Sequence, residues 1–234
     1  MRNPIIVALD VPDAAHAVRL ARSVAPHVGA FKVGKELFVA AGPDMVRELR
    51  ATGAKVFLDL KFHDIPNTVA KAVSAATRLD VQMLTIHCSG GSAMMRAAEK
   101  AAQNTALELN RPAPLVLGVT VLTSMDSTAL AELGGESDPA NQVRRLALLA
   151  ASAGLRGLVC SPLELSTLRS LVPADLQLVT PGIRTSTDAA DDQKRTLSAP
   201  EAIQAGANWL VIGRPIYAAP DPAAAAQKIL ASLN

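Results

Sequence analysis

The chain has 234 residues, of which 50% are hydrophobic and 19% are charged, with a formal net charge of +2. This length and composition allow either one large core or two small domains. The near-neutral charge, the scattered basic residues and an aromatic content of 3% exclude the basic or base-stacking surfaces that are typical of nucleic-acid-binding proteins.

The two cysteines, Cys88 and Cys160, do not have the spacing of a metal or redox site. Each lies at the end of an apolar run, where we expect a small buried thiol. Residues 1–4 lead into only a short apolar run, which is not typical of a signal peptide. No segment approaches the roughly 20 apolar residues that span a bilayer. We therefore expect a cytoplasmic protein that binds neither membranes nor nucleic acids.

Short apolar runs recur along the chain, and an alanine- and leucine-rich amphipathic stretch follows each of them. The expected strands are 5–9, 30–33, 55–60, 83–87, 115–120, 157–160, 177–180 and 209–212. The expected helices lie near 13–25, 43–52, 66–79, 92–109, 139–153, 163–171, 199–205 and 217–232. The runs are continuously apolar rather than alternating, which predicts strands that are covered on both faces.

The strands follow one another mostly at about 25–30 residues, the size of a βα unit. Eight such units predict an α/β protein with one (β/α)₈ TIM barrel domain over residues 1–234. The competing architecture is an open doubly wound sheet, which a glycine-rich turn after the first strand would favour. Residues 10–13 read Asp-Val-Pro-Asp instead. No linker or low-complexity segment indicates a second domain.

Polar residues collect where the expected strands end, which is where barrel enzymes have their active sites. They are Asp10, Lys32, Asp59, Lys61, His87, Thr120, Thr123, Ser124, Arg184 and Arg214, the last of them preceded by Gly213. The opposite ends of the strands have no matching collection. This asymmetry predicts a functional site at the carboxyl ends.

The densest group of charges is Asp59, Lys61 and Asp64, at the end of the third apolar run. Asp59 and Lys61 are two residues apart, so a strand directs them to the same side. Charges at the end of a buried strand are costly unless they compensate one another or do chemistry. A structural ion network is one interpretation, but such networks stabilise weakly. We favour a catalytic role for these residues, because a fixed ammonium suits a reaction that passes through a carbanion.

Lys32 lies inside an apolar segment, where an ammonium needs a carboxylate partner. Its natural partners are Asp10 and Asp59 on the flanking strands. Asp10 could instead cap a turn, although its place at a strand end favours a ligand hydroxyl. His63 and His87 are more typical of hydrogen-bonded structural residues, and no cluster has metal-ligand spacing.

The tripeptide from Gly213 to Pro215 follows the last strand and begins a helical pattern, which favours a phosphate site over a plain turn. The segment 184–199 after the seventh strand is long and polar. A loop of this length beside a phosphate site is typical of a lid.

Taken together, these motifs resemble the orotidine 5′-phosphate decarboxylase family of the bacterial type over essentially the whole chain. The matching segments are 8–10, 31–38, 59–68, 119–124, 180–184, 192–195 and 211–215. Metal-dependent sugar-phosphate decarboxylases and aldolase-like enzymes share the Asp-x-Lys-x-x-Asp core, but their second strand carries a glutamate that helps to bind magnesium. Lys32 occupies that place here and would repel a divalent cation. A metal-dependent enzyme of that kind and a non-catalytic nucleotide-phosphate binding protein are the alternatives.

The resemblance implies decarboxylation of orotidine 5′-monophosphate (OMP) to UMP and CO₂ in pyrimidine biosynthesis, without a metal or cofactor. It implies that Lys61 stabilises the carbanion at pyrimidine C6 and donates the proton that replaces CO₂. Asp59 would lie beside the departing carboxylate, and Lys32 and Asp10 would hold the charge network and the ribose hydroxyls.

The resemblance further implies a homodimer with shared sites, in which Asp64 and Thr68 reach the neighbouring subunit's site. Thr123 or Ser124 would contact the pyrimidine. The residues implied at the phosphate are Arg184, Gln193, Gly213 and Arg214, with the loop 184–199 closing over it.

Overall fold

The computed structural model of the chain describes residues 3–184 and 196–233, and over them the predicted (β/α)₈ barrel is confirmed. All eight strands are parallel and pair in sequence order, and the first strand also pairs with the last. They are β1 (Ile5–Ala8), β2 (Ala30–Gly34), β3 (Val56–Phe62), β4 (Met83–His87), β5 (Leu115–Val119), β6 (Gly157–Val159), β7 (Gln177–Thr180) and β8 (Trp209–Ile212).

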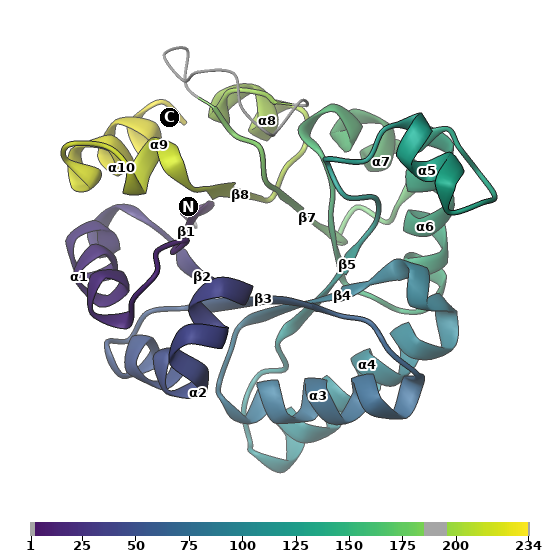
Figure 1. Ribbon diagram of the computed structural model, residues 1–234, viewed down its shortest axis with the longest axis horizontal. Coiled ribbons are helices and arrows are strands. Elements are labelled where there is room, and N and C mark those ends of the chain that lie inside the picture. The colour runs from purple at the N-terminus through teal and green to yellow at the C-terminus, as the bar shows by residue number, and fades with distance from the viewer. Residues whose placement is uncertain (1–2, 185–195, 234) are drawn as a thin grey trace.

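The helices form a ring outside the strands (Figure 1). They are α1 (Ala14–Val24), α2 (Lys35–Ala51), α3 (Pro66–Arg78), α4 (Gly91–Glu108), α5 (Ser127–Glu132), α6 (Pro139–Ser152), α7 (Leu165–Leu171), α8 (Ala199–Gln204), α9 (Arg214–Tyr217) and α10 (Pro222–Ala231). Among the described residues, none of these helices is both long and apolar enough to cross a bilayer.

The helices differ from the expectation in three places. The predicted helix 43–52 begins earlier, at Lys35, because the chain stays helical on both sides of a kink at Gly42, where φ is 66°. The predicted helix 217–232 is confirmed over Pro222–Ala231 but starts later than predicted: α9 ends at Tyr217, and the next helix starts after Asp221, whose side chain accepts a hydrogen bond from the Ala224 N–H. The short helix α5 was not predicted.

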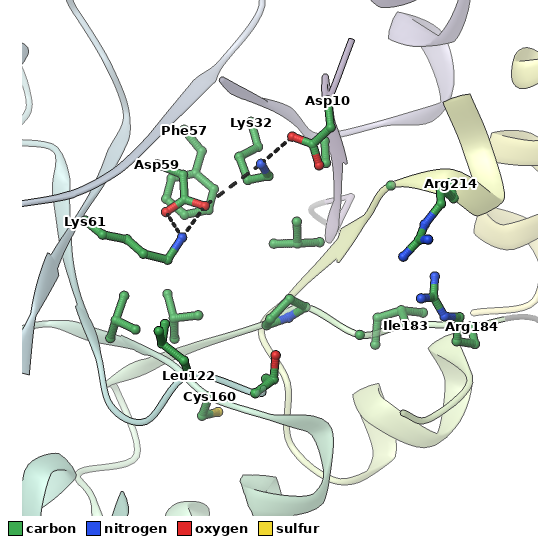
Figure 2. Close-up of a pocket in the computed structure, with 18 of the residues that line it drawn as sticks. Asp10, Lys32, Phe57, Asp59, Lys61, Leu122, Cys160, Ile183, Arg184 and Arg214 are labelled. Carbon is green, nitrogen blue, oxygen red and sulfur yellow. Dashed lines mark hydrogen bonds and ion pairs between the residues drawn. The ribbon is translucent and has the colours of Figure 1, made fainter. Parts of the chain in front are cut away.

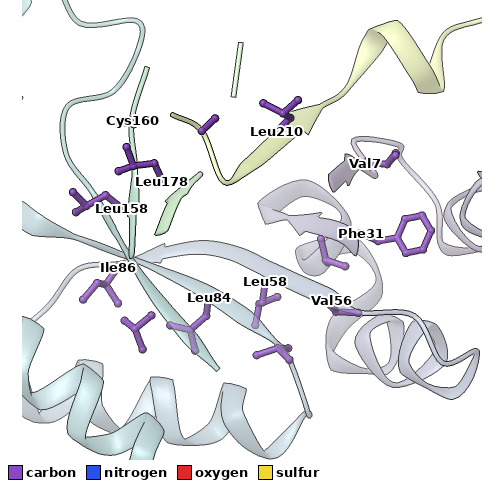
Figure 3. Packing of buried hydrophobic residues seen from close by; sticks show 14 of the residues in the cluster. Val7, Phe31, Val56, Leu58, Leu84, Ile86, Leu158, Cys160, Leu178 and Leu210 are labelled. Atoms are coloured by element: carbon purple, nitrogen blue, oxygen red, sulfur yellow. The ribbon is translucent and has the colours of Figure 1, made fainter. Parts of the chain in front are cut away.

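Side chains alternate between the inside of the barrel and the layer beneath the helices. The inner cluster contains Ile6, Ala8, Ala30, Phe57, Met83, Leu117, Val179, Trp209 and Val211. Their sequence neighbours, such as Val7, Leu58 and Leu84, belong to the larger cluster that packs against the helices (Figure 3). Burial on both sides explains why the strands read as continuous apolar runs.

This alternation also determines which residues reach the functional end of the barrel. Several inner apolar positions are followed, two residues later, by a polar side chain or a glycine. These residues are Asp10, Lys32, Asp59, Thr85 and Gly213. The side chains inside the barrel are therefore apolar along most of the strands and become polar at the carboxyl ends.

Candidate active site

A cavity of about 440 Å³ opens at the carboxyl ends of the strands (Figure 2). Its polar lining residues are Asp10, Lys32, Asp59, Lys61, Thr123, Cys160, Arg184, Arg214 and Tyr217. Apolar side chains, among them Phe57, Val159 and Val211, complete its wall. The size is typical of a site for a small molecule.

Four charged side chains form a chain of alternating sign along one wall (Figure 2). The Nζ atom of Lys32 lies 2.8 Å from Oδ1 of Asp10 and 3.9 Å from Oδ2 of Asp59. The Nζ atom of Lys61 donates to both oxygens of Asp59, at 2.8 and 2.9 Å. The structure thus brings together the four residues that the strand ends suggested.

Asp59 is the centre of this chain, and only 13% of its side chain is exposed. Burial raises the pKa of Asp59. The charges of Lys61 and Lys32 and the hydrogen bonds from Lys61 and Thr85 lower it by more, so the pKa lies below its usual range. The carboxylate is therefore ionised at neutral pH. It holds the Lys61 ammonium against the cavity.

The end of β3 is not the regular strand that the two-residue spacing predicted. Leu58 pairs with Leu84 and Phe62 pairs with Ile86, so four steps along β3 lie opposite two steps along β4. Within this bulge Lys61 has a φ of 54°, which is uncommon for a residue with a side chain. Asp59 and Lys61 do meet on one side, but a bulge brings them together and not simple alternation.

Thr85 of β4 contacts both members of the pair, and the sequence reasoning missed it. Its Oγ1 accepts a hydrogen bond from the Lys61 N–H at 2.9 Å and donates one to Asp59 Oδ1 at 2.9 Å. The available signal was its position, because Thr85 is a polar residue at an inner position of β4, between the apolar Leu84 and Ile86.

Two arginines lie at the end of the cavity opposite the Asp59–Lys61 pair. Arg184 follows β7 and Arg214 follows β8, and Figure 2 shows their guanidinium groups directed toward each other. Gly213 lies beside them in the lining. Two guanidinium groups at one point are suited to a dianion such as phosphate.

Gln193 and residues 185–195 of the expected lid lie outside the described residues. The two ends of that segment are described and are tied together. Ile183 bridges to Leu197, and the Arg184 N–H donates to the Leu197 carbonyl oxygen at 3.0 Å.

The loop after β5 separates the two candidates for the pyrimidine contact. Thr123 lines the main cavity, whereas Ser124 lines a neighbouring one between this loop and the start of α6. Thr123 also borders that second cavity. Within this single chain, Thr123 is the residue of the two that faces the site.

Asp64 and Thr68 do not line the cavity of their own chain. Both are exposed, and Asp64 Oδ1 accepts a hydrogen bond from the Ile65 N–H at 2.6 Å. Ile65, next to Asp64 in the chain, is 66% exposed, and Val39 of α2 is 84% exposed. Asp59, Lys61 and Asp64, which are close in sequence, are thus separated in the structure. Asp10, and not Asp64, is the fourth member of the row of ion pairs with Lys32, Asp59 and Lys61.

The remaining titratable groups near the cavity fit supporting roles. The rings of His63 and His87 lie 5.5 Å apart. Burial lowers the pKa of His87, and the nearby charges of His63, Lys61 and Lys35 lower it further. Burial raises the pKa of the Cys160 thiol to about 12, so this lining residue is protonated and a poor nucleophile. Cys88 is also buried, as expected.

The arrangement is suited to an elongated anionic ligand. One end of the cavity offers a fixed ammonium beside a carboxylate, and the other end offers two guanidinium groups. Asp10 and Lys32, between them, can accept and donate hydrogen bonds to hydroxyl groups. An ammonium held in a partly dry site stabilises negative charge that develops next to it.

Comparison with known proteins gives a consistent result over the whole chain. The family model described as Orotidine 5′-phosphate decarboxylase / HUMPS family matches residues 3–229. An orotidine 5′-phosphate decarboxylase of Opitutus terrae is 54% identical, with all of both chains covered. That of Moorella thermoacetica is 51% identical over 100% of this chain and 93% of the relative. The crystal structure of an orotidine 5′-phosphate decarboxylase from Lactobacillus acidophilus superposes with a TM-score of 0.88 at 36% identity, covering 99% of each chain.

Proposed function

The chain belongs to the Orotidine 5′-phosphate decarboxylase / HUMPS family, and from this premise we infer that it removes CO₂ from OMP to give UMP. It is a carboxy-lyase of pyrimidine biosynthesis. The observation that carries the reaction is the Lys61 ammonium, held 2.8 Å from Asp59 at the far end of the cavity from two arginines. We also propose that residues 1–234 form one domain and that the enzyme acts in the cytoplasm.

We propose that Lys61 performs the chemical step. When the bond from C6 to the carboxylate breaks, its electron pair stays on C6 and CO₂ leaves. The pyrimidine offers no neighbouring group that takes up this charge, so the adjacent ammonium stabilises it. A proton then moves from Nζ to C6, and Lys61 recovers a proton from solvent.

The other charged residues prepare this step. Asp59 fixes the Lys61 ammonium and lies where the substrate carboxylate would sit. Lys32 donates to Asp10 at 2.8 Å, and this pair places a donor, the Lys32 ammonium, and an acceptor, the Asp10 carboxylate, beside the ribose hydroxyls. These assignments are supported by the unbroken chain of contacts from Asp10 to Lys61.

We assign the opposite end of the cavity to the phosphate, with Arg184, Gly213 and Arg214 as its ligands and Gln193 as a further one. Thr123 or Ser124 contacts the pyrimidine. The loop 184–199 is proposed to close over the bound nucleotide. Binding energy at the remote phosphate then helps to hold the pyrimidine against Lys61.

Removal of metals is expected to leave the activity unchanged. The Lys32 ammonium stands between the carboxylates of Asp10 and Asp59, so a divalent cation at this place would face a positive charge. Protein treated with EDTA should convert OMP, followed by its absorbance, at the same rate as protein supplied with magnesium. Turnover only after magnesium is added would contradict the proposal and favour a metal-dependent sugar-phosphate enzyme. Binding of UMP without any turnover of OMP would indicate a nucleotide-binding protein.

We further propose that the active unit is a homodimer with shared sites. Asp64 and Thr68 are exposed in one chain, and the apolar side chains of Ile65, between them in sequence, and of Val39 on α2 are exposed as well. Exposed apolar side chains of this kind are suited to contact with a second copy of the chain. Asp64 would then extend the alternating charges into the partner's site, next to Lys61.

Mixing two inactive variants tests the shared site. Lys61→Ala and Asp64→Asn homodimers should each be nearly inactive. In a hybrid dimer one site keeps both Lys61 and Asp64, so subunit exchange should restore about a quarter of the wild-type activity. Sedimentation at micromolar concentration should show a dimer throughout. No recovery on mixing, or a fully active monomer, would contradict the shared site.

A further inference from the structure

Thr85 is a buried polar residue that none of the roles above uses. It lies in the middle of β4, its exposed fraction is 0%, and it faces the inside of the barrel next to β3. We propose that Thr85 is a positioning residue for the decarboxylation, and that its hydroxyl sets where the Lys61 ammonium stands relative to the substrate. The inference rests on the proposed function.

The hydrogen bonds of Thr85 form a closed ring with the catalytic pair. The Lys61 N–H donates to Thr85 Oγ1, Thr85 Oγ1 donates to Asp59 Oδ1, and Lys61 Nζ donates to that same oxygen at 2.8 Å. The direction of each bond is determined, because an N–H can only donate and a carboxylate can only accept. One hydroxyl thus connects the backbone of Lys61 to the carboxylate that holds its side chain.

The backbone of β3 explains why such a connection is needed. The pairing of β3 with β4 stops at Leu58 and resumes at Phe62, and Lys61 lies between them with a φ of 54°. For a residue with a side chain this conformation is strained and persists only where its surroundings hold it. The Thr85 hydroxyl takes the place of the missing strand partner for the Lys61 N–H. Without it, the bulge loses the contact that ties it to β4.

The chemical consequence concerns the reacting end of the site alone. The phosphate contacts come from Arg184 and Arg214, and the hydroxyl contacts come from Asp10, so neither set touches Thr85. A shift of the Lys61 ammonium should therefore change the rate at which bound OMP is decarboxylated, while the affinity for OMP stays largely the same. A displacement of about 1 Å at a reacting group can lower a rate by about 10²-fold.

The test compares three variants on OMP. Thr85→Val keeps the shape and β-branch of the side chain but removes the hydroxyl, and we expect kcat to fall about 10–100-fold while KM changes less than about threefold. Thr85→Ser keeps the hydroxyl and should retain kcat within about threefold. Thr77→Val is the matched control, because Thr77 is a buried threonine whose hydroxyl donates within α3, to the Val73 carbonyl oxygen; its kcat should equal that of wild type.

The proposal is overturned if Thr85→Val keeps the wild-type kcat, or if Thr85→Ser loses as much as Thr85→Val. A loss that appears equally in Thr77→Val would also overturn it. Where Thr85→Val does not fold, Thr85→Cys against Thr85→Ser gives the same comparison, since the thiol is a weak hydrogen-bond donor. A wild-type enzyme that leaves OMP intact would reject the proposed function instead. In that case the crystal structure of Thr85→Val decides, because Lys61 should leave its positive φ and its contact with Asp59 should change.

Discussion

Replacing Lys61 with alanine is expected to lower kcat for OMP by about 10⁴-fold or more, while the protein keeps its fold. Lys61 supplies both the positive charge beside C6 and the proton that C6 receives. Removal of a charge-stabilising donor costs about 10²–10³-fold, and removal of a general acid costs a further 10²–10⁴-fold. The rate should be measured from the loss of OMP absorbance under saturating substrate.

The controls separate chemistry from structure. Lys228→Ala changes an exposed lysine on α10 and should leave kcat unchanged. Binding of UMP to Lys61→Ala should persist, because the arginines at the other end of the cavity are intact. An unchanged kcat in Lys61→Ala would reject Lys61 as the acid. Loss of the circular dichroism signal would mean that the variant does not report on catalysis.

Replacing Arg214 with alanine is expected to lower kcat/KM for OMP by about 10²–10³-fold. A charge-assisted hydrogen bond to phosphate contributes about 1.5–3 kcal/mol, and Arg214 can donate two of them to one phosphate. Part of the loss should appear in kcat, because binding of the phosphate also holds the pyrimidine in position. Steady-state kinetics over a range of OMP concentrations measure both parts.

A substrate without the phosphate makes this test specific. With orotidine, which lacks the phosphate, wild type and Arg214→Ala should turn over at the same low rate, since the missing contact is missing for both. Arg47→Ala, on the exposed face of α2, should match wild type with both substrates. An equal loss with OMP and with orotidine would show that Arg214 does not bind the phosphate.

The sequence allowed the barrel and most of the charged site to be predicted, for reasons that the structure makes plain. Each strand is buried on both faces, so it reads as a continuous apolar run, and polar residues within or just after such a run indicate the functional end of the barrel. Lys32 is the clearest case, because an ammonium inside an apolar segment requires the carboxylates of Asp10 and Asp59 beside it. These features depend on local patterns that a single chain displays.

Features that depend on pairing between strands were not predictable in the same way. The bulge in β3 arises from the register against β4, and neither the positive φ of Lys61 nor the contact with Thr85 appears in the spacing of residues. The same bulge separates Asp64 from Asp59 and Lys61. Three charges that are close in sequence lie on different surfaces, because the chain leaves the barrel after Phe62 and carries Asp64 outward.

The pairing of β1 with β8 has a consequence for how the enzyme is made. These strands come from opposite ends of the chain, and the Leu210 N–H donates to the Pro4 carbonyl oxygen where they meet. During synthesis the edge of β1 that pairs with β8 has no partner until nearly the whole chain has left the ribosome, and an unpaired edge of an apolar strand is prone to aggregation. Asp10 follows β1 and Arg214 follows β8, so the same late event completes the binding site. Appearance of activity should therefore report closure of the barrel, and truncation of the first strand should abolish both together.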